Sequence, residues 1–264
     1  MDRIIIDNTF KNNCLTLNND SYVIVKDDVE TKDFEFNIID CEATIIDMSN
    51  SINKTFNFRN SKATVVEVVN DMETKLLNLN NDNADVEYNI IDLMNSNITY
   101  SIKDEIVKEN GKTNINIASV SYKEKIKNYN VNTSNLNRNT INEINCFGIV
   151  KDKSVLNYDV SSFIKNGAKQ SVVRQSSNIL LFDEESLGKN NPILLIEEND
   201  VKASHGSSIG KIDDETMFYL CSRGLTKNEA TNLICLGKVE YLINKIEDEE
   251  IKESLVNKFK ERMS

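Results

Sequence analysis

Short runs rich in β-branched residues, separated by polar turns, dominate the chain from Arg3 to about Asn128. The period of these runs is nearer two than 3.6, and Ala and Leu are scarce, so the pattern predicts a large all-β body. Asparagine suits the turns because its side chain hydrogen-bonds locally and tolerates left-handed backbone angles. We expect one short helical turn, over residues 71–79. The runs include RIIID, YVIVK, FEFNIID, ATIID, ATVVEVV, VEYNIID and NITYSI.

The next segments continue this pattern with one interruption. Residues 129–145 are polar and poor in large apolar side chains, which favours a loop or a row of asparagine-lined turns. Residues 146–196 return to short apolar runs at fairly regular intervals. Such spacing is typical of a sandwich, a barrel or a β-solenoid, and composition does not choose among them.

The pattern changes between Pro192 and Arg223, a stretch that holds the only proline and the only histidine of the chain, His205. Gly206 and Gly210 lie in the serine-rich text SHGSSIG, between an apolar run that begins at Pro192 and a helical pattern. We expect this segment to form a bend that presents His205 at a strand-to-helix junction.

Three helices are expected after this bend. Asp213 is placed to cap a first helix that ends near Gly224, where a left-handed cap favours glycine. Thr226 and Glu229 have the spacing of a capping box and predict the start of a second helix. We expect a third helix after the acidic segment at residues 247–250. One face of the second is expected to hold Ala230, Leu233, Ile234, Gly237 and Tyr241, and one face of the third Ile251, Leu255, Val256 and Phe259.

Charge and cysteine content limit the possible functions. The 264-residue chain has 31 basic and 42 acidic residues, a net charge of −11, which disfavours nucleic acid as a partner. The amino terminus lacks the pattern of a signal peptide and no long apolar run is present, so we expect a cytoplasmic protein without a membrane partner. The five cysteines are odd in number and widely spaced, which favours free thiols.

The sequence from Gln175 to Arg223 resembles the SufB/SufD family of iron–sulfur cluster assembly proteins, and SufD-like chains most closely. The resemblance rests on QSSNILLF at residues 175–182, on NDVKASHGSSIGKID at residues 199–213 and on FYLCSRGLTKNEA at residues 218–230. It covers roughly residues 154–263, whereas the first half of the chain matches the family only in its β-rich character.

The resemblance implies a mainly β fold, a right-handed parallel β-helix over residues 1–210 with a C-terminal α-helical region over residues 211–264. It implies a non-enzymatic subunit of a SufBCD-type complex, with a SufC-like ABC-type ATPase bound to the helical region. The other partner is a SufB-like scaffold subunit or a second copy of the chain. A transient iron–sulfur cluster or iron, shared with that partner, is implied to bind at His205. The residues expected to contact partners are Phe218, Tyr219, Arg223, Leu233 and Tyr241.

The sequence also departs from the family pattern. Ser176 stands where SufB-like chains have a scaffold cysteine, and Ala203 stands where SufD-like chains commonly have one. Ser204 and Gly206 occupy positions where SufB-like chains carry glutamates. The helical N-terminal region of full-length relatives is expected to be absent, because strand-like text begins at Arg3. One histidine with scattered cysteines lacks the donors of a complete iron site, so further ligands are expected from another chain.

Plainer interpretations stand beside these. His205 is alternatively a loop histidine that orders the junction, and Cys221 and Cys235 are expected to be buried structural thiols. A nucleophilic role for Ser176 is disfavoured because no second histidine is available. Two further functions are weighed: a homodimeric scaffold for the ATPase, disfavoured by Ser176, and a carbohydrate-active β-solenoid, disfavoured by the missing export signal.

Overall fold

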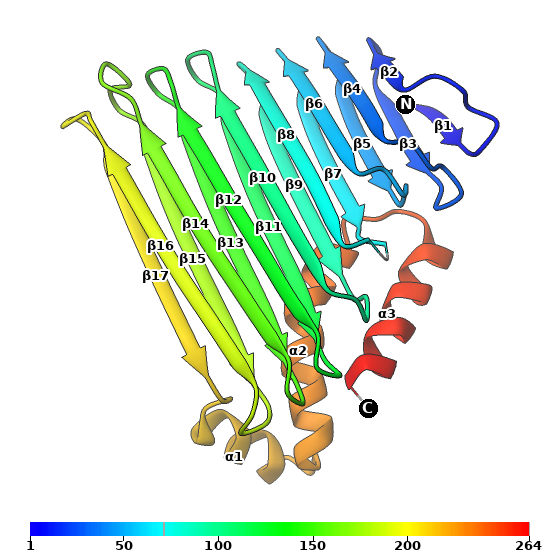
Figure 1. Cartoon of the computed structure of the whole chain (residues 1–264), viewed down its shortest axis with the longest axis vertical. Helices are drawn as coiled ribbons and strands as arrows, with labels where there is room; N and C mark the ends of the chain where they lie inside the picture. Colours follow the sequence, from blue (N-terminus) through cyan, green and yellow to red (C-terminus); the bar gives the residue numbers. More distant parts are fainter. Residues whose placement is uncertain (71, 264) are drawn as a thin grey trace.

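Two parallel β-sheets face each other along most of the chain in the computed structural model, which describes residues 1–70 and 72–263 (Figure 1). The odd sheet contains β1 (Asp2–Ile6), β3 (Ser21–Val25), β5 (Glu42–Asp47), β7 (Lys62–Val68), β9 (Asp85–Asp92), β11 (Lys112–Ser121), β13 (Ile141–Val150), β15 (Val172–Leu181) and β17 (Lys202–Gly210). The even sheet contains β2 (Cys14–Leu17), β4 (Asp33–Ile39), β6 (Asn53–Arg59), β8 (Thr74–Asp82), β10 (Ile98–Ile106), β12 (Ile126–Asn135), β14 (Val155–Ile164) and β16 (Leu187–Ile196).

Each strand pairs in parallel with the strand two places away in the chain, so successive strands alternate between the sheets. This connectivity is that of a parallel β-helix, and it decides among the three β architectures that the sequence left open. The coils lengthen along the chain, as the growing strands of Figure 1 show. Lys62 hydrogen-bonds Glu42, 20 residues earlier, whereas Asn178 hydrogen-bonds Ser208, 30 residues later.

The interior between the sheets is filled by stacked side chains from equivalent positions of successive coils. Phe36 and Phe56 stack with ring centroids 4.3 Å apart, and Tyr129 and Tyr158 lie 5.4 Å apart further along. Strands with alternating burial, such as β14, supply every second side chain to this core. The period-two pattern of the sequence therefore reflects one face inside and one face outside the β-helix.

Asparagine at the turns behaves as the sequence predicts. Asn60 and Asn83 have positive φ angles of 46° and 59° at equivalent corners of successive coils. The Asn83 side chain donates to Oδ1 of Asn60 at 3.0 Å, and Asn60 donates to Oδ1 of Asp40 at 3.1 Å. The turn residues thus form a ladder of their own along the edge of the β-helix.

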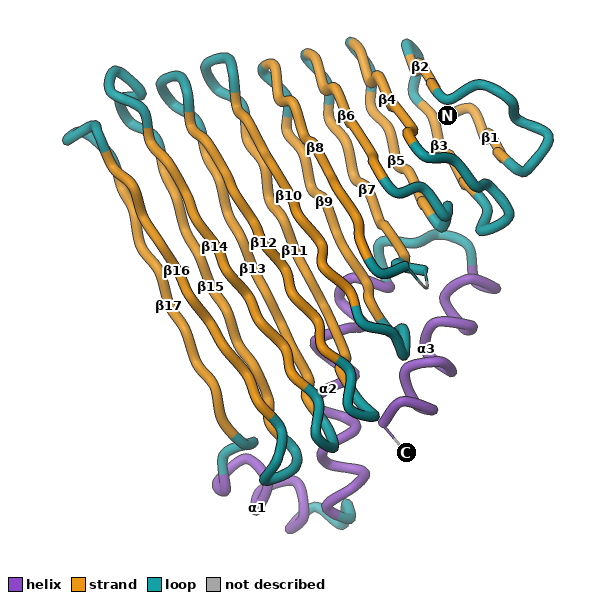
Figure 2. The backbone as a smooth tube through the Cα atoms, viewed as in Figure 1, coloured by secondary structure: helices purple, strands orange, loops and turns teal. Residues whose placement is uncertain are grey.

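Three helices follow the last strand: α1 (Asp214–Ser222), α2 (Lys227–Ile243) and α3 (Glu249–Met263), drawn in purple in Figure 2. Asp213 accepts a hydrogen bond from the Thr216 amide, Thr226 and Glu229 form the capping box, and Gly224 has φ +98°. These expected helix boundaries are confirmed. Helices α2 and α3 share an apolar cluster with outward-facing residues of the odd sheet, including Ile46, Val66, Ile91, Ala118 and Ile149.

The face expected for the second helix is wrong. Ala230 is buried, but Leu233, Gly237 and Tyr241 are exposed. The stripe that faces the odd sheet is rotated around the helix from the expected one, because large apolar residues occur on more than one side of α2. Its buried members are Ala230, Cys235, Val239, Leu242 and Ile243.

Two expectations for polar segments are also wrong. Residues 74–82 form strand β8 and not a helical turn, because their alternate side chains pack inside the coil; residue 71 lies outside the described residues. Residues 129–145 belong mostly to strands β12 and β13. Their outward asparagines join neighbouring coils, as the 3.0 Å hydrogen bond from Asn145 to Oδ1 of Asn116 shows, so a strand needs few apolar residues here.

The serine-rich segment at residues 204–210 forms a strand and not a bend. It belongs to β17, which pairs in parallel with β15 along its whole length. Gly206 and Gly210 do not have the positive φ angles that Gly167 and Gly224 adopt. The apolar run beginning at Pro192 is strand as expected, within β16, an edge strand where a proline is tolerated.

Candidate functional site at the open end of the β-helix

His205 lies in the middle of β17, the last strand of the odd sheet, at the open end of the β-helix. It is paired with Gln175 on β15. Paired residues of an in-register parallel sheet point their side chains to the same side, and Gln175 is buried in the interior. His205 therefore continues an interior row, and it is exposed because β17 is the edge of its sheet.

The last coil has a polar interior. Gln175 Nε2 donates to the Ser162 hydroxyl at 2.8 Å and to the Ile193 carbonyl at 3.1 Å, so this side chain spans from the odd to the even sheet. Asn190 Nδ2 crosses in the opposite direction to the carbonyls of Ser177 and Ser208. Polar side chains thus hold the two sheets together directly beneath His205.

The last coil presents free strand edges and exposed apolar side chains, both on its outward face and on the interior side that is left open at the end. Strands β16 and β17 each have a paired neighbour on one side only, and unpaired edges are places where another chain adds a strand. The left side of Figure 1 shows this pair of edges. Large apolar residues exposed on these strands are Leu187, Ile193, Leu195, Ile196 and Ile209. An exposed apolar patch of this kind marks an interaction surface.

The chain alone does not assemble a metal centre around His205. Within residues 1–70 and 72–263, no three His, Cys, Asp or Glu side chains are grouped so that they could hold a metal ion. Ala203 lies on the same side of β17 as His205 but carries no donor atom, and Ser176 is on the opposite side of its strand from Gln175. An imidazole at this position can contribute one ligand only.

Burial makes two of the cysteines poor thiolates. All five are free, as the sequence predicts. Burial raises the pKa of Cys146 and of Cys235 to about 12, so both stay protonated. Cys235 is buried as expected, whereas Cys221 is only half-buried on α1.

The residues expected to contact a partner are exposed on α1 and α2. Helix α1 has no buried residue, and Phe218 and Tyr219 are 76% and 56% exposed on it. Arg223 lies over the Tyr219 ring, 5.3 Å from its centroid. Leu233 and Tyr241 are exposed on α2, although the Tyr241 hydroxyl also reaches Oε1 of Glu87 on the odd sheet at 3.4 Å. The structure therefore presents an apolar and aromatic helical surface.

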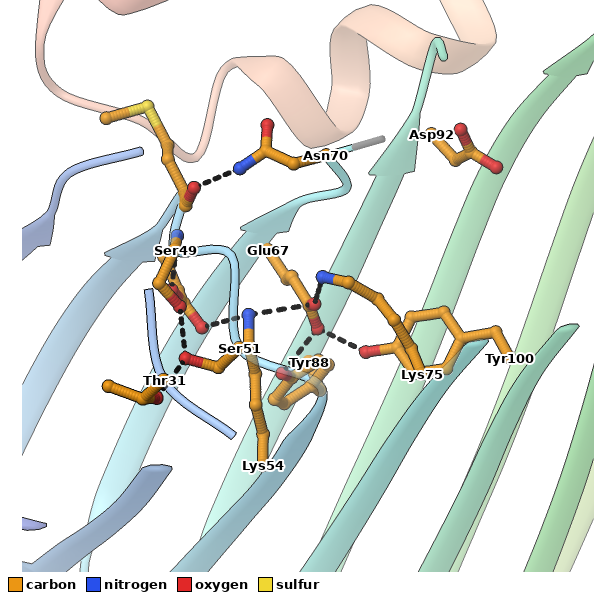
Figure 3. A network of polar contacts seen from close by, with 12 residues as sticks. Thr31, Ser49, Ser51, Lys54, Glu67, Asn70, Lys75, Tyr88, Asp92 and Tyr100 are labelled. Carbon is orange, nitrogen blue, oxygen red and sulfur yellow. Dashed lines mark hydrogen bonds and ion pairs between the residues drawn. The ribbon is translucent and has the colours of Figure 1, made fainter. Parts of the chain in front are cut away.

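A buried cluster of ionisable side chains inside the β-helix was missed by sequence reasoning (Figure 3). Lys54 Nζ lies 2.6 Å from Oδ2 of Asp47 and 3.0 Å from Oε1 of Glu67, and Lys75 Nζ lies 2.9 Å from the same Glu67 oxygen. Tyr88 and Tyr100 donate to the other oxygen of Glu67. Further along, Asp92 accepts from Lys127 at 2.7 Å and from Tyr129 at 2.5 Å.

This cluster is a structural cross-link between the sheets. Burial by itself raises the pKa of Glu67, but Lys54 and Lys75 outweigh it and hold that pKa below its usual range. Two carboxylates face two ammonium groups, and all four are buried. The period-two pattern indicates that both lysines face the interior. Lys54 lies two positions before the inward Phe56, and Lys75 lies two positions before the inward Leu77.

The fold and site define a parallel β-helix that carries helices on one sheet and an exposed histidine at its open end. The family model described as "SUF system FeS cluster assembly, SufBD core domain" matches residues 10–238. The chain belongs to this family, which confirms the resemblance read from residues 175–230.

Relatives with assigned roles match the chain over less than half of its length. It is 36% identical over 110 residues to the iron–sulfur cluster assembly protein SufD of Bacillus subtilis, covering 42% of this chain and 25% of that protein. It is 30% identical over 115 residues to the SufD protein of Escherichia coli, covering 44% and 27%. An iron–sulfur cluster assembly SufBD family protein of Pyrococcus horikoshii is 36% identical over 104 residues, covering 38% and 23%. The alignments thus span about a quarter of each relative.

Helices α1, α2 and α3 are the helices of the part of the chain that the structure describes. None of them combines the length and the apolar character required to cross a bilayer.

Proposed function

We propose that this chain is a SufD-like, non-enzymatic subunit of an iron–sulfur cluster assembly complex, and that it contributes His205 as one ligand to a transient cluster or iron. The observation that carries the proposal is the position of His205, exposed on the interior side of the last strand. The names of the SufD relatives support the process. The remaining ligands must come from a second chain, because a single imidazole does not hold a cluster.

The open end of the β-helix is the surface proposed to bind that second chain. Strand addition at the edges of β16 and β17 supplies main-chain hydrogen bonds, and the exposed apolar residues of the last coil supply buried area. The proposed occupant is a SufB-like scaffold. A second copy of this chain is the alternative, and native mass spectrometry of the purified complex distinguishes the two by mass.

The helical surface is proposed to bind a SufC-like ABC-type ATPase. Helix α1 contributes no buried residue to the chain, yet it exposes Phe218 and Tyr219. Large aromatic side chains with a neighbouring arginine are typical of the central part of protein interfaces. This proposal accounts for a helix that the isolated chain does not use in its own core.

The ligand role is tested by expressing the chain with the ATPase and scaffold of its own organism and measuring iron and acid-labile sulfide in the purified complex. His205→Ala is expected to lower both while the complex stays assembled. Ser204→Ala is the matched control, because Ser204 is exposed on the same strand but on its outward side. Unchanged cluster content in His205→Ala would leave this residue with a structural role in ordering β17.

Docking of the ATPase is tested separately in the same co-purification. Phe218→Ala and Tyr219→Ala are expected to reduce the retained ATPase by tenfold or more, since buried interface aromatics contribute about 2 kcal/mol or more each. Ile126→Ala, which truncates an exposed apolar residue of the even sheet, serves as the control. Equal retention of the ATPase by all three variants would contradict the docking surface.

A further inference from the structure

Four acidic side chains are fully buried within the described residues, and one of them differs from the rest. Asp47 and Glu67 face Lys54, and Asp92 faces Lys127, all within 3.0 Å. Asp104 on β10 has no lysine or arginine partner among the ion pairs of residues 1–70 and 72–263. A buried carboxylate without a counter-charge is expensive, so the state of this group needs an explanation.

The hydrogen-bond partners of the Asp104 carboxyl group are a hydroxyl and an amide side chain. Its paired neighbours in the even sheet are Leu79 on β8 and Thr133 on β12. From the odd sheet, Thr113 and Asn142 hydrogen-bond its carboxyl group. The charged group that acts on it is Glu105, the next residue of its own strand, and a negative charge there disfavours ionisation.

The contact between Asp104 and Asn142 leaves two acceptors without partners. Nδ2 of Asn142 donates to Oδ2 of Asp104 at 2.5 Å. The remaining oxygens of the two groups, Oδ1 of Asp104 and Oδ1 of Asn142, are buried and have no hydrogen-bond partner in the protein. If the carboxyl group is ionised, both atoms are acceptors only and neither can satisfy the other. Each such atom then costs the free energy of an unmade hydrogen bond.

We propose that Asp104 is protonated in the folded protein and forms a two-bond ring with Asn142, so that ionisation of Asp104 acts as a pH-sensitive switch inside the β-helix. In this ring Nδ2 of Asn142 donates to Oδ2 of Asp104, and the proton on Oδ1 of Asp104 is donated to Oδ1 of Asn142. One proton satisfies both unpartnered oxygens. Burial raises the pKa of Asp104 to about 7, against smaller lowering by Asn142 and Thr113, so the proton is held up to neutral pH.

The ring has a defined place in the fold. It joins β10 of the even sheet to β13 of the odd sheet across the interior. The row of Asp104 continues through Thr133 to Ser162, whose hydroxyl accepts from Gln175 beneath His205. Loss of the proton from Asp104 would therefore weaken the interaction between the two sheets in the coils that support the open end.

Ionisation of Asp104 is expected to lower the free energy of unfolding as the pH rises. Between the usual pKa of 3.8 and the folded value of about 7, the folded chain holds a proton that the unfolded chain has released. Stability from this group is complete below the unfolded value and is lost as the pH rises through the folded value. The unfolding constant should rise by up to about tenfold for each pH unit in that window.

The test is infrared spectroscopy of the full chain at pH 6, where exposed carboxyl groups are ionised. Wild type is expected to show the band of a protonated carboxyl group, and isotope labelling of the aspartates should shift it. Asp104→Asn should lack the band. An amide at 104 both donates and accepts, so it keeps the ring without a titrating proton and should remove the tenfold-per-unit pH dependence. Asp85→Asn, at an exposed aspartate of β9, is the control.

Two results would overturn the proposal. One is the absence of a protonated aspartate band in wild type at pH 6, a measurement that needs no variant to fold. The other is a pH dependence of unfolding in Asp104→Asn that equals that of wild type between pH 5 and pH 8.

Discussion

Gln175 and His205 are paired neighbours on β15 and β17, and their side chains lie on the same, interior side of the odd sheet. Gln175, on the odd sheet, donates to the Ser162 hydroxyl and the Ile193 carbonyl of the even sheet, whereas His205 ends the row and is exposed. The proposed ligand therefore lies on a rigid polar base. Such support is what a binding residue needs to keep its orientation while a second chain approaches.

Replacing Gln175 with leucine should destabilise the open end. The substitution removes hydrogen bonds to the Ser162 hydroxyl and the Ile193 carbonyl, and a buried polar partner left unsatisfied costs about 1–3 kcal/mol. The measurement is urea unfolding together with hydrogen exchange of the β16 amides, which should exchange faster. Asn178→Ala, which removes an exposed hydrogen bond of the same strand, should cost less than half as much. A larger loss in the control would show that the interior bonds are unimportant.

Glu67→Gln should be among the most destabilising polar substitutions in this chain. It leaves Lys54 and Lys75 buried with one carboxylate fewer, and breaking a buried ion pair from one side costs about 3–5 kcal/mol. The free energy of unfolding at pH 7 measures this cost. Glu42→Gln, which breaks the exposed pair with Lys62, should change stability by less than about 1 kcal/mol.

Glu67 also predicts an acid limb of stability opposite in direction to the effect of Asp104. Although burial alone raises its pKa, the two lysines lower the folded value below the unfolded one. The stability it contributes is present above the usual glutamate range near pH 4.5 and is lost as the pH falls toward the folded value. Unfolding measured from pH 7 down to pH 3 should show this loss in wild type and a weaker one in Glu67→Gln.

The features that the sequence predicted correctly depend on residues close together in the chain. The cap at Asp213, the capping box of Thr226 and Glu229 and the left-handed Gly224 each involve contacts within four residues. Interactions between residues so close in the chain can be recognised from the amino-acid sequence. The β-rich character and the turn asparagines were predictable for the same reason.

The features that were missed depend on contacts between residues on different strands. The serine and glycine residues of β17 form a strand because β15, 30 residues earlier, offers a free edge. Inward lysines such as Lys54 are tolerated because Glu67 of another strand meets them. The β-helix itself was inferred through family resemblance, since local periodicity fits several β architectures.

Gly148→Ala should destabilise the interior by about 1–3 kcal/mol through overpacking. A Cβ atom at 148 would lie 2.3 Å from Cδ2 of Leu156 and 3.3 Å from Cε2 of Tyr158, so these side chains must move. Gly206→Ala is the matched control on the same sheet, because a Cβ there meets nothing within 4 Å. Thermal unfolding compares the two. Equal midpoints would mean that Leu156 relaxes at no cost, contrary to the close packing of this core.

Asn83→Val should destabilise the chain, while Asn83→Gly should be tolerated. The φ angle of Asn83 is 59°, a left-handed conformation that costs a residue with a Cβ about 1–2 kcal/mol and a β-branched one at least as much. Glycine adopts this angle freely and loses only the exposed hydrogen bond to Asn60. Asn157→Val, an outward strand position on β14 where β-branched residues are favoured, separates the backbone effect from the loss of an asparagine ladder contact. If urea unfolding shows that valine costs the same at 83 and at 157, the left-handed angle is not what selects asparagine at these corners.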